Sequence, residues 1–407
     1  PLPPPPLPMH LTSEEQPLPA GHAGPAAQKA MRILETLGRI YSAEKMIPVA
    51  SVQISGVSYA NLGEAGLDWL TEMAEGGGQA QVLTTLNPAG MDVENYRVLG
   101  IDEGFAENQR RVLRAFEQMG VVATCSCTPY LFGNLPHFGE HIAWAESSAV
   151  CYANSVLGAR TNREGGPSAL AASLTGRTPD YGYHLDINRQ PTVQVHVGVD
   201  LPDNPHFGAL GKVIGDRIQA TKEARVPYLT GVEVASLENL KSLCASIATF
   251  GGVALFHIPG VTPEAAFYDP SEETLAVTQA DLDQALDTMN TAPAEKVDFV
   301  SLGCPHLSLR EIQRVAELLK GQQVKKEFWI TTSRPIKGMA DRMGYTAVIE
   351  AAGAKFATDT CCVVAPIQGR FKALATDSAK ACYYAEAKNH FKTRLLPFDE
   401  VVREALQ

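Results

Sequence analysis

Five of the eight cysteines lie in short segments whose composition could support chemistry. Cys125 and Cys127 occur in TCSCTPY, Cys304 occurs in SLGCPH, and Cys361 with Cys362 occurs in TDTCCVVAP. Eight cysteines in 407 residues are too sparse for a disulfide scaffold, and thiols stay reduced in the cytoplasm, where we expect this chain to work. The five are therefore free thiols, core residues or metal ligands. Their separations match no local zinc or ferredoxin motif, so spacing alone does not decide between these uses.

The other three cysteines are interpreted as packing residues. Cys151, Cys244 and Cys382 lie in apolar helical patterns such as KSLCASIA. A cysteine in such a pattern behaves as a small buried hydrophobic side chain.

The segment that follows TCSCTPY is dense in polar groups. GEHIAWAESSAVCYANSVLG (139–158) predicts a helix on which Glu146 and Asn154 face either solvent or a polar cavity. The next loop, TNREGGPS, carries Asn162 and Arg163 together with two glycines that let the backbone approach a ligand. It could hold an anion, or it could be a tight connection with an exposed arginine.

Three further loops after predicted strands combine serine with polar or basic residues. SGVSYANLG contains Ser58, TTSRP contains Ser333 and Arg334, and TDSAKACYY contains Ser378 and Lys380. Serine with arginine or lysine at the ends of strands can grip a carboxylate. Each instance could instead be a helix cap, because serine caps helices frequently.

Three histidines lie near the candidate cysteines. His137, His141 and His306 could each be a ligand, an acid–base group or a hydrogen-bonded core residue. The motifs that would identify a common nucleotide site or hydrolase are absent, because the sequence has no GxGxxG fingerprint with its acidic residue, no P-loop, no HExxH and no GxSxG.

The elements that must position these residues alternate between helical and strand-like patterns. Apolar residues at helical spacing predict helices over 26–41, 67–75, 105–120, 237–252, 281–291 and 309–321. Short apolar runs predict strands over 48–55, 81–86, 121–125, 253–258, 297–303 and 327–333. This alternation predicts an α/β protein with parallel sheets in three αβα layers. Binding sites gather at the carboxyl ends of parallel strands, so the loops with Cys127, Cys304 and Cys361 could meet in one crevice.

Length and composition narrow the classes of function. A chain of 407 residues predicts two or three lobes. A net charge of −11 opposes nucleic-acid binding, and no apolar run reaches the roughly 18 residues that span a membrane. We therefore expect neither nucleic acid nor membrane as a partner. Residues 1–8, PLPPPPLP, favour polyproline II and are interpreted as a linker or a vector scar.

Several long blocks in a fixed order carry a family resemblance. They are TCSCTPYLFGNLPHFGEHIAWAESSAV, ANSVLGARTNREGGPSALAASLTGRTP, SLGCPH, TSRP, ATDTCCVVAP and TDSAKACYYA. From about residue 9 to 400 the chain resembles aconitase X, a branch of the aconitase superfamily. The resemblance implies the large, catalytic unit of a hydro-lyase, with aconitase-like lobes over roughly 9–190 and 191–407 and without the swivel domain.

The resemblance also implies an iron centre held by three cysteines. The family's motif residues match Cys127 before Thr-Pro-Tyr, Cys304 in Gly-Cys-Pro-His and Cys361 in Asp-Thr-Cys. They would hold an iron–sulfur cluster, 2Fe–2S or 4Fe–4S, or a single iron. The match leaves Cys125 and Cys362 as spare thiols, and in an extended chain the side chain of Cys362 would point away from that of its neighbour Cys361. With three protein ligands the iron keeps an open site and acts as a Lewis acid on the substrate hydroxyl.

The resemblance implies a partner as well. The superfamily's base is a serine on a swivel domain, which aconitase X carries as a small subunit or as a fused domain. This chain should therefore bind iron alone but need that partner to turn over a small hydroxyacid. Within the chain, the candidate catalytic residues are Arg163, Ser333 and Lys380. The candidate substrate contacts are Ser58, Asn162, Arg163, Ser333, Arg334, Ser378 and Lys380.

Members of the family are known to act on two substrates, cis-3-hydroxy-L-proline in bacteria and mevalonate 5-phosphate in archaea. We expect the former, with Δ1-pyrroline-2-carboxylate as the product, because the chain lacks the Lys and Glu enrichment of hyperthermophiles and shows no obvious basic cluster for a phosphate. An alternative from another class is an iron–sulfur redox sensor or binding protein, to which exposed Cys125 and Cys362 would be suited.

Overall fold

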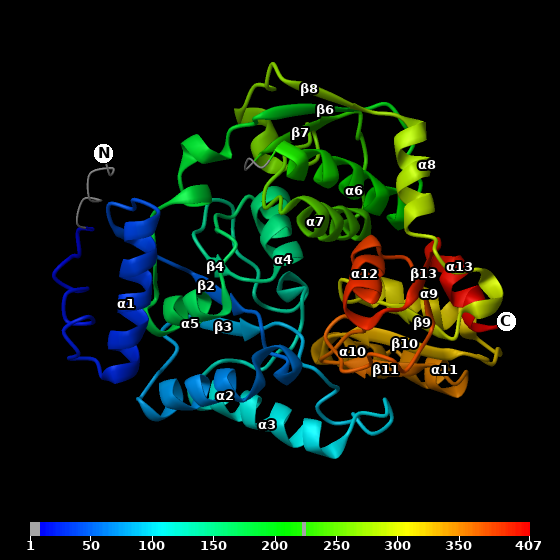
Figure 1. Cartoon of the computed structure of the whole chain (residues 1–407), viewed down its shortest axis with the longest axis horizontal. Coiled ribbons are helices and arrows are strands. Elements are labelled where there is room, and N and C mark those ends of the chain that lie inside the picture. Colours follow the sequence, from blue (N-terminus) through cyan, green and yellow to red (C-terminus); the bar gives the residue numbers. More distant parts are fainter. Residues whose placement is uncertain (1–8, 222–224) are drawn as a thin grey trace.

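The computed structural model describes residues 9–221 and 225–407, and these residues form three lobes in chain order (Figure 1). We call them the N-terminal lobe (9–190), the middle lobe (191–296) and the C-terminal lobe (297–407). Each lobe has its own parallel sheet, which confirms the predicted α/β class. The interpretation of residues 1–8 falls outside the described residues. No helix within those ranges is long and apolar enough to cross a membrane.

The N-terminal lobe is built on a sheet with the strand order β3-β2-β4. Its strands are β2 (Ser51–Ile54), β3 (Leu83–Leu86) and β4 (Ala143–Trp144). Helices α1 (Pro25–Ile40) and α5 (Gly166–Thr175) cover one face, and α2 (Tyr59–Glu75) and α3 (Glu103–Gln118) cover the other (Figure 1). A separate antiparallel pair joins β1 (Met46–Pro48) to β5 (Arg177–Pro179).

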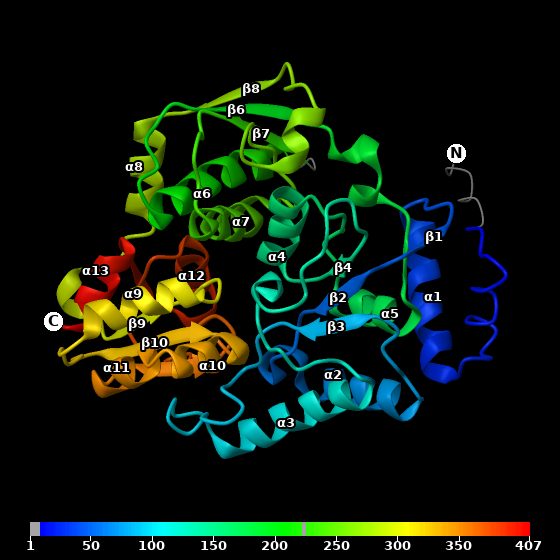
Figure 2. The same ribbon diagram turned by 180° about the vertical axis from the view of Figure 1, so that it is seen from behind.

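The middle lobe has the strand order β7-β6-β8. Its strands are β6 (Val193–Val197), β7 (Pro227–Thr230) and β8 (Thr274–Val277), and its helices are α6 (Asn204–Thr221), α7 (Leu237–Gly251) and α8 (Gln279–Thr288). Helices α6 and α7 run side by side in both views (Figures 1 and 2). Glycines allow this close approach, because a Cβ on Gly211 would lie 2.7 Å from the Cβ of Ser246.

The C-terminal lobe has a five-stranded parallel sheet in the order β11-β10-β9-β12-β13. The strands are β9 (Phe299–Leu302), β10 (Glu327–Thr332), β11 (Lys355–Thr358), β12 (Ala373–Thr376) and β13 (Lys392–Leu395). One apolar cluster joins this sheet to α9 (Leu309–Leu319), α10 (Arg334–Arg342), α11 (Tyr345–Ala351) and α13 (Phe398–Ala405). A second cluster joins it to α12 (Ala379–Tyr384) and to residues 91–101 of the N-terminal lobe. The sheet is therefore the middle layer of three, as the sequence predicted.

The close packing of α6 against α7 makes a prediction about stability. Gly215→Ala is expected to lower the free energy of unfolding by about 1–3 kcal/mol, since its Cβ would lie 2.7 Å from the backbone nitrogen of Gly251. The matched control is Gly338→Ala in α10, where a Cβ meets no atom within 4 Å. We expect that change to be stabilising by about 0.5–1 kcal/mol, because alanine favours a helix more than glycine does. Urea unfolding measures both, and equal destabilisation of the two variants would contradict the glycine contact.

Two predicted strands are wrong. Residues 121–125 and 253–258 form no strand, and each touches a sheet only through one bridge, Val122 to Thr85 and His257 to Tyr228. In the first segment Cys125 has a φ of 46°, a left-handed conformation that turns the chain away from the direction of a strand.

The predicted helix over 139–158 is also wrong in its first half. Ala143–Trp144 form strand β4, and the helix α4 (Ser147–Tyr152) begins only after Glu146, whose side chain caps it by accepting a hydrogen bond of 2.7 Å from the backbone N–H of Ala149. The helix then widens into a π-helical turn, η2 (Ala153–Leu157). Periodicity alone missed the strand because its two residues carry the same apolar character as the helix.

Candidate active site

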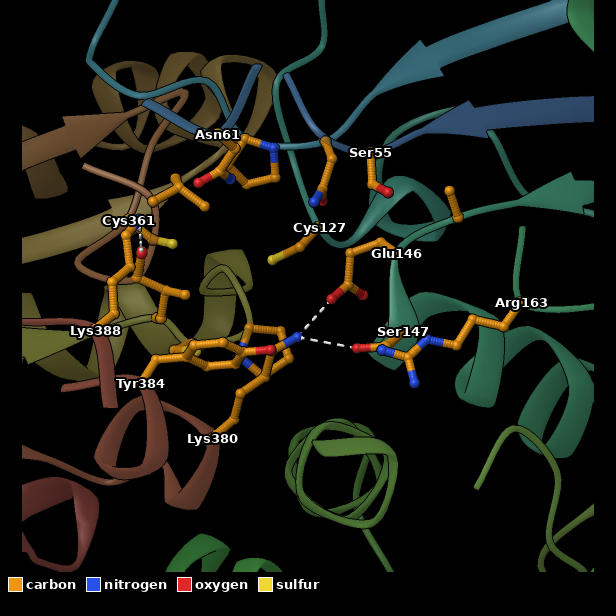
Figure 3. Close-up of a pocket in the computed structure, with 18 residues that line it drawn as sticks. Ser55, Asn61, Cys127, Glu146, Ser147, Arg163, Cys361, Lys380, Tyr384 and Lys388 are labelled. Carbon is orange, nitrogen blue, oxygen red and sulfur yellow. Dashed lines mark hydrogen bonds and ion pairs between the residues drawn. The ribbon is translucent and has the colours of Figure 1, made fainter. Parts of the chain in front are cut away.

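A cavity of about 240 Å³ lies between the N-terminal and C-terminal lobes (Figure 3). The N-terminal lobe contributes polar or thiol side chains from the ends of β2, β3 and β4, from the first turns of α2 and α4 and from nearby loops, namely Ser55, Asn61, Asn87, Cys127, Glu146, Ser147 and Arg163. The C-terminal lobe contributes Cys304, Cys361, Lys380, Tyr384 and Lys388. The cavity thus lies where strand-end loops of two lobes meet, as expected for parallel α/β sheets.

The three predicted donor cysteines all line this cavity. Cys127 and Cys361 are buried and Cys304 is half-buried. In Figure 3 the sulfurs of Cys127 and Cys361 point toward one another across the cavity. Among the described residues, no group of three or more His, Cys, Asp or Glu side chains is arranged to hold a metal ion. The thiols therefore surround a space and do not converge on one position.

Burial keeps these thiols protonated. It raises the pKa of Cys127 and Cys361 and raises that of Cys304 to about 12. The Cys361 thiol raises the pKa of both other thiols further, so the three are near enough to repel one another if ionised. A bound cation would remove this penalty, because metal ligation deprotonates a thiol.

The spare thiols are not exposed, which corrects the redox-sensor hypothesis. Cys125 is 0% and Cys362 is 4% exposed, and each belongs to an apolar core cluster. A sensor thiol needs solvent access to meet an oxidant, so neither residue is suited to that role. The interpretation of Cys151, Cys244 and Cys382 as buried packing residues is confirmed.

A buried ion pair crosses the cavity wall from one lobe to the other. Lys380 Nζ lies 2.5 Å from Glu146 Oε1 and 3.4 Å from Ser147 Oγ (Figure 3). The other carboxylate oxygen of Glu146 accepts hydrogen bonds from Ser148 Oγ at 2.5 Å and from the backbone N–H of Ala149. Burial opposes both charges, but Lys380 and these donors lower the pKa of Glu146, while Glu146 raises the pKa of Lys380. Both groups are therefore charged at neutral pH.

Two more basic side chains line the cavity. Arg163 is exposed, points its guanidinium toward the cavity in Figure 3, and makes no hydrogen bond or ion pair within residues 9–221 and 225–407. Lys388 Nζ donates to the backbone oxygen of Val363 at 2.8 Å, and burial lowers its pKa. Arg163, Lys380 and Lys388 thus face Glu146 as the lone carboxylate among the described lining residues, an arrangement that favours an anionic ligand.

The structure keeps three predicted substrate contacts out of the cavity lining. Ser58 Oγ donates to the backbone oxygen of Val364 at 3.1 Å. Ser333 caps α10 and Ser378 caps α12, accepting from the backbone N–H of the third residue in each helix. Ser333 and Ser378 therefore follow the capping alternative, whereas the Ser58 side chain makes no capping hydrogen bond and joins the N-terminal lobe to the loop after Cys361.

Asn162 and Arg334 also bind within the protein. The Asn162 side chain donates to Tyr181 O at 3.0 Å and accepts from Tyr183 N at 2.9 Å. Arg334 pairs with Asp92 at 3.0 Å, with Glu94 at 2.7 Å and with Asp359. Arg334 is therefore paired with carboxylates of the chain itself and not left free for a substrate. These ion pairs join the N-terminal lobe to the loop before Cys361.

The three histidines have different surroundings. His137 is exposed beside Glu140, and His141 Nδ1 lies 2.9 Å from His184 Nδ1. His306 is fully buried among the cysteine loops, and burial lowers its pKa to about 4. None of the three lines the cavity.

The sequence did not identify Ser147, Tyr384 or Lys388. Tyr384 is the last residue of α12, and Lys388 lies in the π-helical turn into which α12 passes, η7 (Ala385–Asn389), just as α4 passes into η2. Such turns occur frequently at functional sites. The related SAxC pattern at 148–151 and SAxxC pattern at 378–382 were the signal available in the sequence. Glu146 does face a polar cavity, whereas Asn154 is 0% exposed and donates to Thr161 O and Ala254 O.

Comparison with protein families matches three consecutive models to the chain. The model for the aconitase X first domain matches residues 8–187, that for the second domain matches 191–287, and that for the third domain matches 297–407.

Full-length relatives fall into two groups. The phosphomevalonate dehydratase large subunit of Methanocaldococcus jannaschii is 46% identical over 92% of this chain and 95% of its own length, and that of Thermococcus kodakarensis is 43% identical over 98% and 100%. The cis-3-hydroxy-L-proline dehydratase of Pseudomonas aeruginosa is 34% identical over 92% of this chain but only 66% of its own length. A solved structure, Thermococcus kodakaraensis aconitase X in its holo-form, superposes with a TM-score of 0.91 at 43% identity, over 98% of this chain and all of that one.

Proposed function

The chain belongs to the aconitase X family and is a dehydratase, and from this premise we propose that it is the large subunit of an enzyme that removes water from mevalonate 5-phosphate. The observation that carries the proposal is a sequence identity of 43–46% along nearly the whole length of proteins named phosphomevalonate dehydratase large subunit. The expected preference for cis-3-hydroxy-L-proline is not supported, since two relatives named for that activity are each only 34% identical to this chain.

The charges of the cavity support the same choice. Mevalonate 5-phosphate carries a carboxylate and a phosphate, while hydroxyproline is a zwitterion. Arg163, Lys380 and Lys388 supply basic groups against the single lining carboxylate of Glu146 among the described residues. Arg163 is distant in the sequence from Lys380 and Lys388, and only the fold brings it to the same cavity as the two lysines, which is why no basic cluster was visible in the sequence. The amino-acid composition was also a poor guide to the substrate. The Lys and Glu content of a protein varies with the growth temperature of the organism and does not depend on the substrate.

Within this proposal Cys127, Cys304 and Cys361 hold an iron centre. Three thiols from three loops line one cavity, and thiolates are the ligands that iron–sulfur clusters prefer. When bound, such a centre supplies a Lewis acid for the departing hydroxyl group. The solved relative is described as a holo-form, which is consistent with a cofactor in this family.

The basic residues bind and orient the substrate. Glu146 holds Lys380 Nζ beside Ser147 at the cavity wall, where the ammonium group can bind a carboxylate. The free guanidinium of Arg163 can bind the phosphate through two parallel hydrogen bonds. We retain Arg163 and Lys380 as functional residues and do not retain Ser333, since it caps a helix outside the lining. The proton is removed by a serine of a small subunit, a partner that the name of the relatives implies.

The test is a comparison of two substrates with the complete enzyme. The chain is co-expressed with a small subunit and purified without oxygen, and loss of water is measured from mevalonate 5-phosphate and from cis-3-hydroxy-L-proline. We expect kcat/KM to favour the phosphate substrate at least about 100-fold, a difference of about 2.7 kcal/mol. Arg163→Met should raise KM for that substrate without lowering thermal stability, because the side chain is exposed. Turnover of hydroxyproline alone would reject the proposal.

A further inference from the structure

The three donor cysteines lie on three loops, of which two follow strands of the same sheet and the third, that of Cys127, lies outside that sheet. Cys127 follows the irregular segment 121–125, Cys304 follows β9, and Cys361 follows β11. The first loop belongs to the N-terminal lobe and the other two to the C-terminal lobe. A site made of three thiols therefore needs a contact that fixes these loops relative to one another.

The side chain of His306 makes that contact. Its Nδ1 lies 3.0 Å from Ser126 Oγ, and its Nε2 lies 3.0 Å from the backbone oxygen of Thr360. A carbonyl oxygen only accepts, so Nε2 carries the hydrogen, and Nδ1 accepts from the Ser126 hydroxyl. Ser126 directly precedes Cys127, and Thr360 directly precedes Cys361. One imidazole thus joins two donor loops while its own backbone belongs to the third.

The backbone of His306 adds a contact to the sulfur itself. Its N–H donates to Cys127 Sγ at 3.2 Å. The histidine is 0% exposed, and Ser126 is fixed in turn because its backbone N–H donates to Leu86 O at 2.9 Å, at the end of β3. An N–H group that points at a sulfur stabilises the thiolate form, and it influences the reduction potential of a metal centre bound to that sulfur.

We propose that His306 is a positioning residue that holds Cys127, Cys304 and Cys361 in register around the cavity. The inference rests on the proposed function, since it takes these cysteines as the ligands of the iron centre. His306 is not itself a ligand, because both of its ring nitrogens already bind neighbouring loops.

The experiment compares His306 variants with a histidine buried elsewhere. His306→Ala removes both ring contacts, His306→Asn keeps an acceptor near Nδ1, and His306→Gln keeps a donor near Nε2. The matched control is His257→Ala in the middle lobe, since His257 is also 0% exposed and its Nε2 lies 2.8 Å from Arg189 O. Each variant is purified with the small subunit without oxygen. Bound iron per chain is then measured against a graded chelator, together with the visible absorption spectrum and the thermal midpoint.

We expect His306→Ala to weaken iron retention by about 10–100-fold and to shift the absorption bands, with part of the loss recovered in His306→Asn and His306→Gln. His257→Ala should lower the thermal midpoint but leave iron content and spectrum unchanged.

Two other outcomes would contradict these expectations. If the His306 variants keep their iron content and spectrum while Cys304→Ser loses iron, this inference is overturned and the proposed function stands. Retention of iron by the cysteine variants would overturn the proposed function itself. If His306→Ala fails to fold, the iron content and the absorption spectrum of His306→Asn and His306→Gln test the inference in its place.

Discussion

Replacing Cys304 with serine should lower kcat/KM for dehydration by at least about 1,000-fold, a loss of about 4 kcal/mol in transition-state stabilisation. Cys304 lines the cavity together with Cys127 and Cys361, and the proposed iron centre depends on all three. A serine hydroxyl is a poor substitute for a soft thiolate, so the variant should lose both iron and the Lewis-acid contribution, which amounts to several kcal/mol. The measurements are iron per chain and steady-state kinetics with saturating small subunit.

The neighbouring thiols provide the control for this prediction. Cys362 is adjacent to Cys361 in sequence but packs into an apolar core cluster, and Cys125 does the same beside Cys127. Cys362→Ala and Cys125→Ala should therefore retain iron and absorption, although each loses some stability through the small cavity left behind. Loss of iron in Cys362→Ala with retention in Cys361→Ser would show that the ligand had been assigned to the wrong member of the pair.

Lys380→Met should have two separable effects. It leaves the Glu146 carboxylate, whose side chain is 5% exposed, without its cation, and removal of one partner from a buried pair costs about 3–5 kcal/mol of stability. It also removes a group proposed to bind the substrate carboxylate, so kcat/KM should fall at least about 100-fold. The double variant Lys380→Met/Glu146→Gln should recover most of the stability and none of the activity.

A second buried pair separates general destabilisation from loss of function. Lys241 Nζ lies 2.6 Å from Glu311 Oε2, and the Lys241 side chain is 2% exposed, but neither residue lines the active-site cavity. Lys241→Met should therefore lower the thermal midpoint as much as Lys380→Met does, with a far smaller effect on kcat/KM measured below that midpoint. Recovery of activity in the double variant Lys380→Met/Glu146→Gln would instead assign Lys380 a purely structural role.

Amphipathic periodicity predicted α1, α3 and α9, each of which buries one face, but it did not predict α6, α10 or α13. It failed where backbone geometry decides the outcome. Strand β4 has only two residues and is defined by its pairing with β2, which a local pattern does not reveal.

The candidate site was only partly predicted, because a local sequence pattern does not show which side chains meet in the folded chain. Motif likeness identified the three cysteines, but the loops around Arg163 and Arg334 looked alike in sequence. Arg334 pairs with Asp92, 242 residues away in the chain, whereas Arg163 has no such partner among the described residues. Only the tertiary structure distinguishes an arginine neutralised by its own chain from one free to bind an anion.

The spread of the cavity residues along the chain has a consequence for biosynthesis. Glu146 and Lys380 are 234 residues apart, and the third proposed donor cysteine, Cys361, follows the first, Cys127, by the same number of residues. At an elongation rate of about 5–20 residues per second, a ribosome needs roughly 12–47 s to reach Lys380 after Glu146 has been made. During that interval the nascent N-terminal lobe holds an uncompensated acidic group and one donor thiol. On the proposed function, all three thiols are available to an iron centre only after Cys361 has been made, so a polypeptide terminated before that residue would lack one of the proposed ligands.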